Sequence, residues 1–179
     1  KTLASVSWAL EHSKHNKLKR IIVVLPFINI IDQTASILKD IFGEEYILEH
    51  HSGNNDEITI NEDIHDHDSW KRLACENWDY PIIITTTVQF FESIFSNKPG
   101  KCRKIHNIAE SVVIFDEVQS LPKEIIIPTL TILGNMLSVM NTSFLFCTAT
   151  LPAFEKREFF NGIESIIPLV ENPEILFHK

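Results

Sequence analysis

The sequence predicts a single α/β domain in which helices cover both faces of a parallel sheet. Five short runs rich in β-branched or aromatic residues alternate along the chain with segments of helical periodicity, which is typical of this class. Several runs are apolar at nearly every position, as expected for parallel strands that are buried on both faces. With 179 residues, 44% of them hydrophobic, the chain can form one domain around a sizeable core.

The individual elements follow from these two patterns in chain order. Strands are predicted at RIIVVLP (20–26), YILEHH (46–51), PIIITT (81–86), SVVIFDE (111–117) and SFLFCTAT (143–150). Helices are predicted over residues 2–15, 28–42, 69–77, 87–96 and 123–140. Pro128 lies inside the last helical pattern, so we expect that helix to start late or to bend there. Residues 96–104 are predicted as a loop and residues 52–68 as a surface excursion.

Cysteine usage and hydropathy indicate where the protein works. Cys75, Cys102 and Cys147 are odd in number and widely spaced, which indicates neither a disulfide framework nor a zinc site and favours a reducing, cytoplasmic setting. No apolar stretch reaches the roughly 18 residues needed to cross a bilayer. The first residues resemble no signal peptide, so we expect a soluble protein with no membrane partner.

The net charge of −8 argues at first against a nucleic-acid partner, but its distribution matters more than its sum. Residues 44–79 carry eleven acids and two bases, whereas the rest of the chain carries fourteen bases and thirteen acids. A nucleic acid would therefore avoid the acidic segment. Contacts made by backbone amides and hydroxyls need no basic excess, so the charge does not exclude a single-stranded DNA partner.

Asp116 and Glu117 stand side by side at the end of a predicted buried strand, where charge without a partner is costly. In sheets of this kind, ligands bind outside the carboxyl ends of the strands. An aspartate there can hold Mg²⁺, and a neighbouring glutamate can polarise the water that attacks a γ-phosphate. The alternative, which two acids alone would favour, is that they begin a loop or cap the next helix.

The chain opens with KTLASVSWALEH, an amphipathic helical pattern that begins with Lys1 and Thr2. The phosphate-binding pattern G-x-x-x-x-G-K-[ST] ends with the same two residue types before a helix. Its glycines are absent, so residues 1–179 look like a domain cut just inside that loop. An ordinary helix that happens to start with Lys-Thr is the alternative.

Six segments in this order resemble the helicase portion of the CRISPR-associated helicase-nuclease of type I interference systems, within helicase superfamily two. They are KTLASVSWALEH (1–12), RIIVVLPFINIIDQTASIL (20–38), LEHHSG (48–53), IIITTTVQFFESIFSN (82–97), VVIFDEVQSLP (112–122) and FLFCTATLP (144–152). The resemblance implies the first of two RecA-like P-loop NTPase lobes, with ATP and Mg²⁺ as cofactors. Six segments in the right order are far more specific than any one of them alone.

The resemblance also implies roles for single residues. Lys1 would contact the β- and γ-phosphates, and Thr2 and Asp116 would hold Mg²⁺. Glu117 would act as the general base or position the water. Gln119 would bridge towards the coupling motif, formed by Thr148, Ala149 and Thr150. The residues expected along the single-strand track are Pro26, Phe27, Thr86, Thr87 and Gln89, although the two threonines could equally cap the helix that follows them.

For the intact protein, the resemblance implies an ATP-dependent translocase or helicase on single-stranded DNA that acts in CRISPR interference, an antiviral defence. Its partners would be a second RecA-like lobe, an HD nuclease domain and a guide-RNA surveillance complex. The chain alone is expected to have little or no ATPase activity and no nuclease activity, because the glycine loop, the arginine finger and the HD domain lie outside it. Two alternatives stay open: another superfamily-two helicase acting on DNA or RNA, and a non-catalytic docking module with a degenerate nucleotide site.

Histidines and tryptophans offer weaker signals. Residues 65–68, HDHD, have metal-ligand types, but four consecutive residues in a loop cannot all face one ion, so a solvated loop is favoured. His50 and His51 are expected to pack or to form hydrogen bonds rather than to bind a metal. The three tryptophans could stack on bases but are expected in the core; they are Trp8, Trp70 and Trp78.

Overall fold

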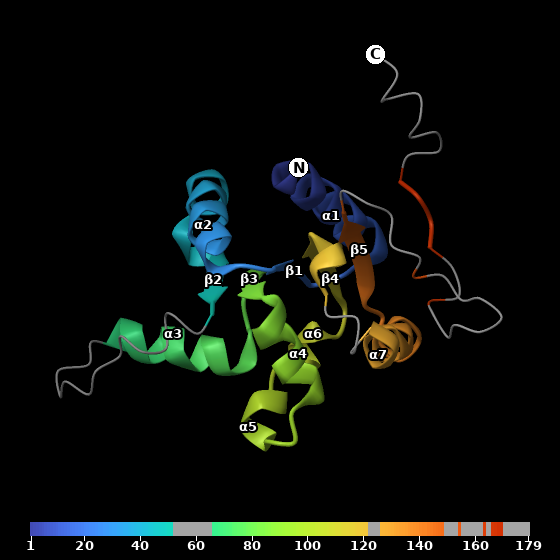
Figure 1. The fold of residues 1–179 in the computed structure, drawn as a ribbon. Coiled ribbons are helices and arrows are strands. Elements are labelled where there is room, and N and C mark those ends of the chain that lie inside the picture. The colour runs from blue at the N-terminus through green and yellow to red at the C-terminus, as the bar shows by residue number, and fades with distance from the viewer. Residues whose placement is uncertain (52–65, 122–125, 149–153, 155–162, 164–165, 170–179) are drawn as a thin grey trace, which may run out of the picture.

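A computed structural model shows a five-stranded sheet with all strands parallel and with the order β2-β3-β1-β4-β5 (Figure 1). It describes residues 1–51, 66–121, 126–148, 154, 163 and 166–169. The strands are β1 (Arg20–Leu25), β2 (Ile47–His50), β3 (Ile82–Thr86), β4 (Ser111–Asp116) and β5 (Ser143–Cys147). The α/β prediction is confirmed, and each strand lies within one of the predicted runs.

The helices lie on both faces of this sheet (Figure 1). One face is covered by α1 (Thr2–Asn16) and α2 (Ile28–Phe42). The other is covered by α3 (Asp66–Asn77), α4 (Thr87–Phe95), α6 (Ile105–Ile108) and α7 (Ile126–Val139). Three short elements complete the described fold: α5 (Pro99–Cys102) and the 3₁₀ turns η1 (Glu44–Tyr46) and η3 (Val118–Ser120).

Continuous apolar runs form the strands because successive side chains enter two separate cores. In β1, Ile21, Val23 and Leu25 pack with α1 and α2, whereas Ile22 and Val24 pack with the helices of the opposite face. The same alternation occurs in β4. A strand buried on one side alone would need polar residues at every second position. The sequence has none in the middle of these two strands.

Aromatic rings dominate the core on the face of α3, α4 and α7. The ring of Phe90 lies with its centroid 5.2 Å from that of Phe115 and 6.4 Å from that of Trp78. Trp78 is completely buried, and its Nε1–H donates a hydrogen bond of 3.0 Å to His50 Nδ1. The predictions for Trp78 as a core residue and for His50 as a hydrogen-bonding residue are therefore confirmed.

Several local predictions were wrong. Trp70 is 72% exposed, because it lies on a part of α3 that no other described element covers. Residues 66–68 of the HDHD segment are helical and belong to α3 rather than to a loop; residue 65 lies outside the described part. The predicted loop 96–104 contains α5, which has Pro99 at its first position, where proline is tolerated.

Pro128 lies within α7, whose described part runs from Ile126 to Val139. The predicted start at residue 123 lies outside the described residues, so the late start or bend stays a prediction. Among the described residues, no helix combines the length and the apolar character that a membrane span requires.

Replacing Phe90 by alanine should lower the free energy of unfolding by about 3–5 kcal/mol, because the fully buried ring would leave a cavity between α4 and the sheet. Val88 is the matched control on the same helix. It is 66% exposed, and its change to alanine should stay within about 0.5 kcal/mol. Urea unfolding measures both. Equal losses for the two variants would contradict this placement of α4.

Candidate functional site

The carboxyl ends of all five strands meet at one edge of the sheet, because the strands are parallel. Register fixes their neighbours: Leu25 pairs with Thr86, and Asp116 pairs with Cys147. Most residues predicted to bind ligands follow these strand ends directly. The structure thus brings together, at one edge, motifs that lie far apart in the sequence.

Lys1 lies against the acidic pair at this edge. It is the N-cap of α1, which packs along β4 and β1 and carries the lysine to the end of β4. The Lys1 Nζ atom lies 2.7 Å from Asp116 Oδ1 and forms a second ion pair with Glu117 Oε1. Side-chain exposure is 13% at Asp116 and 36% at Glu117, so one acid is set back and the other faces outward.

Glu117 has an unusual backbone conformation. Its φ angle of 51° lies in the left-handed region, which is uncommon for a residue with a side chain. The chain turns there from β4 into η3, and the Glu117 N–H donates a 3.0 Å hydrogen bond to Asp116 Oδ1. Tight turns of this kind recur at functional sites, where surrounding contacts hold a strained residue in place.

Contacts continue from Glu117 across to the end of β5. The Gln119 Nε2 atom donates to Glu117 Oε2, and the Thr148 hydroxyl donates to Gln119 Oε1 at 2.6 Å. A row of polar contacts therefore runs from Lys1 through Glu117 and Gln119 to Thr148. Ala149 and Thr150, the other predicted coupling residues, lie outside the described residues.

Mutual charge shifts the protonation equilibria of this row. Hydrogen bonds from Lys1 and then from Gln119 lower the pKa of the Glu117 carboxyl. Partial burial acts to lower the pKa of Lys1, but hydrogen bonds to Asp116 and Glu117 outweigh it and the pKa is raised. Burial, followed by the Asp116 charge, raises the pKa of the Cys147 thiol. Both shifts favour the charged forms, so at neutral pH the edge carries a charged lysine beside the charged carboxylate of Glu117.

A second group of predicted residues follows β1 and β3. Thr86 is the N-cap of α4, and its hydroxyl accepts a 3.1 Å hydrogen bond from the Gln89 N–H, so the capping alternative holds for this residue. The Thr87 hydroxyl donates to Leu25 O at 3.3 Å. Phe27 is 58% exposed at the neighbouring strand end. Pro26 and Gln89 are half-buried beside them.

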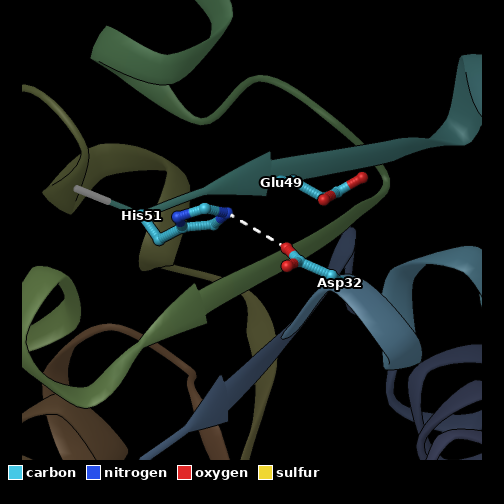
Figure 2. A group of neighbouring side chains, drawn as sticks. All are labelled: Asp32, Glu49 and His51. Carbon is cyan, nitrogen blue, oxygen red and sulfur yellow. Dashed lines mark ion pairs between the residues drawn. The ribbon is translucent and has the colours of Figure 1, made fainter. Parts of the chain in front are cut away.

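Sequence reasoning missed one cluster. Asp32, Glu49 and His51 come together at the end of β2, with their ligand atoms all within 4.8 Å of one another (Figure 2). Glu49 and His51 are two positions apart and so lie on the same face of the strand, which is a signal that the sequence did contain. Asp32, from α2, could be placed only by the fold.

A family model described as DEAD/DEAH box helicase matches residues 1–159. The chain belongs to this family. Over its whole length it is 30% identical to the putative CRISPR-associated nuclease/helicase Cas3 of Methanocaldococcus jannaschii. The aligned part makes up 24% of that protein's length. It is also 29% identical over 69% of its length to the CRISPR-associated nuclease/helicase Cas3 of Haloferax volcanii, of which 15% is aligned. The chain thus spans a quarter or less of these relatives.

This DEAD/DEAH box helicase chain has the architecture that such a domain requires. The parallel sheet with helices on both faces is consistent with a RecA-like lobe, and membership of the family implies use of ATP by the intact helicase. The residues at the strand ends fit a magnesium-nucleotide complex, because carboxylate and hydroxyl oxygens suit Mg²⁺ and an ammonium suits phosphate. Lys1, held by both acids, indicates that this edge stabilises positive charge.

The carboxyl of Glu117 should titrate below the ordinary range of a glutamate, because Lys1 and Gln119 donate hydrogen bonds to its charged form. Changing Lys1 to glutamine should raise the pKa of the Glu117 carboxyl again. Carbon-detected NMR of the side-chain carboxyl measures both values. Lys19→Gln is the control, since that ammonium pairs with Glu110. An unchanged Glu117 pKa in the Lys1→Gln variant would contradict the ion pair.

Proposed function

We propose that the chain is the first ATP-binding lobe of an ATP-dependent helicase that moves along single-stranded DNA in CRISPR interference. The observation that carries this proposal is the row of contacts from Lys1 through Glu117 and Gln119 to Thr148. It joins the segments that would bind phosphate, activate water and couple hydrolysis to movement. An ordinary helix cap or loop start would not need all of them at one edge.

At the nucleotide site, the present contacts of Lys1, Asp116 and Glu117 support a task for each of these side chains. Lys1, now paired with two acids, would turn its ammonium towards the β- and γ-phosphates. Asp116 and Thr2 would hold the Mg²⁺ ion of the nucleotide, which supplies charge neutralisation to the phosphates when bound. Glu117 would orient the attacking water and accept its proton. The lowered pKa keeps the Glu117 carboxylate charged and able to accept hydrogen bonds from the water, but it also makes the group a weaker base, so it supports positioning of the water more than proton abstraction.

Coupling would run through Gln119. Its side-chain amide already contacts Glu117 with the nitrogen and Thr148 with the oxygen. A change in the position of Glu117 on hydrolysis would therefore reach the end of β5 through two hydrogen bonds. Thr150 and Ala149 would extend this path towards a second RecA-like lobe.

The nucleic-acid track would follow the ends of β1 and β3. Phe27 offers an exposed ring on which a base can stack, beside Pro26. Thr86, Thr87 and Gln89 would contact phosphates with hydroxyl, amide and backbone groups at the start of α4, where the helix dipole favours negative charge. No basic surface is needed for such contacts, which suits the near-neutral charge of the chain outside residues 44–79.

The wider context is carried by the relatives. Both are named as CRISPR-associated nuclease/helicases. We therefore place the chain in a longer antiviral protein with a second lobe and an HD nuclease domain, which meets DNA opened by a guide-RNA surveillance complex. The ATPase belongs to that longer protein, and the chain alone would hydrolyse little. Another superfamily-two helicase, acting on DNA or RNA, and a docking module are the competing functions.

In a protein that carries this chain with an upstream glycine loop and a second lobe, Glu117→Gln should lower kcat for DNA-stimulated ATP hydrolysis by about 100-fold or more. Nucleotide binding, followed with a fluorescent ATP analogue, should persist because the phosphate contacts remain. Glu110→Gln is the control, since Glu110 pairs with Lys19. Undiminished turnover in Glu117→Gln would refute the role of this residue.

Phe27→Ala should weaken binding of single-stranded DNA by the same protein by about 1–3 kcal/mol, the usual worth of one stacked base. Ile41→Ala, at the other end of α2 and 54% exposed, should leave binding unchanged. Fluorescence anisotropy with labelled DNA and RNA of one sequence measures both. Tighter binding of the RNA than of the DNA would favour the competing RNA helicase. No binding of either strand would favour the docking module.

A further inference from the structure

We propose that Asp32, Glu49 and His51 form a binding site for one divalent transition-metal ion, with Zn²⁺ as the best match. The site is separate from the nucleotide edge of β4 and holds no residue of the proposed ATPase. It lies where the start of α2 meets the end of the edge strand β2 (Figure 2).

Strand geometry and helix packing bring the three side chains together. Glu49 and His51 are two residues apart, so both side chains leave the backbone on the face that α2 covers. Asp32 lies in the second turn of α2, and its carboxylate points towards the His51 ring (Figure 2). Helix α2 and strand β2 therefore hold Asp32 and Glu49, and His51 follows β2 directly.

His51 is the observation that points to a ligand. It is only 3% exposed, yet neither ring nitrogen has a hydrogen-bond partner among the described residues. Burying an imidazole in this way is costly unless something satisfies it. The preceding residue shows the contrast, since His50 Nδ1 accepts a 3.0 Å hydrogen bond from Trp78.

Distances in the cluster suit ligands that share an ion. His51 Nε2 lies 3.6 Å from Asp32 Oδ1, which is too long for a hydrogen bond. Two atoms bound to a tetrahedral zinc ion at about 2.0–2.2 Å are about 3.4 Å apart. The third donor, a Glu49 oxygen, lies within 4.8 Å of both. A small rotation of the exposed Asp32 carboxylate, with a smaller one of the mostly buried Glu49 carboxylate, would bring all three donor atoms to one ion.

Charge and access also fit. The two carboxylates attract a divalent cation. The Lys39 ammonium forms an ion pair with Glu49 Oε1, which leaves a net charge of −1 before an ion binds, and the carboxylate has a second oxygen to offer. Asp32 and Glu49 line a hollow of about 550 Å³ together with Ser36, Lys39, Asp40 and Glu44, which gives an ion a path from solvent to the two carboxylates.

The donor set selects the class of ion. An imidazole nitrogen with two carboxylates suits Zn²⁺ or a similar first-row metal better than Ca²⁺ or Mg²⁺, which prefer oxygen alone. Three protein ligands leave one position for water. The ion would link the beginning of α2 to the end of β2. Helix α2 directly follows Phe27, the residue proposed to contact DNA.

Isothermal titration calorimetry of the chain with ZnCl₂ tests the site. We expect one ion per chain with a micromolar or tighter Kd. Asp32→Asn should weaken this binding by more than about 10-fold, and so should His51→Gln. Asp32 is 68% exposed at its side chain, so the first variant keeps the test valid if the buried histidine proves necessary for folding.

Two controls separate this site from unspecific zinc binding. Asp40→Asn removes a carboxylate from the same hollow but not from the cluster, and it should leave the Kd unchanged. The double change of His65 and His67 to glutamine removes the histidines of the HDHD segment and should also have no effect. Wild-type affinity in Asp32→Asn, or loss of binding only in the double variant, would overturn the proposal.

Discussion

The two central strands of this protein are buried on both faces, and this constraint decides where its chemistry can lie. From Ile21 to Leu25 and from Val112 to Phe115, every side chain enters one of two apolar cores. Charged groups there would lose their hydration without gaining partners. Polar side chains can first appear where the strands end. Asp116, the last residue of β4, is therefore at the earliest position that can hold a carboxylate in contact with solvent and ligand.

Helices bring further polar residues to the carboxyl ends of the strands. Helix α1 packs across β4 and β1 and delivers Lys1 to the acids, and α4 starts directly at the end of β3 with Thr86 as its cap. The edge strand β2 obeys a looser constraint, because only one neighbour pairs with it. It carries Glu49, and His51 follows it directly, both on the face of α2, so the proposed metal site lies apart from the central edge.

The sequence by itself determined the class of the fold and most element bounds, and it predicted the edge where ligands would bind. Apolar runs that fit only two-sided burial predicted the parallel sheet. For four of the five strands, each predicted bound differs from the observed one by at most one residue. Its motifs identified Lys1, Asp116, Glu117, Gln119 and Thr148, which the structure brings into one row of contacts. These features are local or periodic, so neighbouring residues are enough to specify them.

Only the tertiary structure decided which distant side chains meet. The left-handed turn at Glu117 depends on the packing around it, so a linear pattern could not give it. The exposure of Trp70 shows the same limit, because helical spacing says which residues share a face but not whether anything covers that face. Asp32 and His51 are 19 positions apart, and they meet because α2 lies on the sheet beside β2. Long-range contacts of this kind are set by how two elements pack, which no single segment encodes.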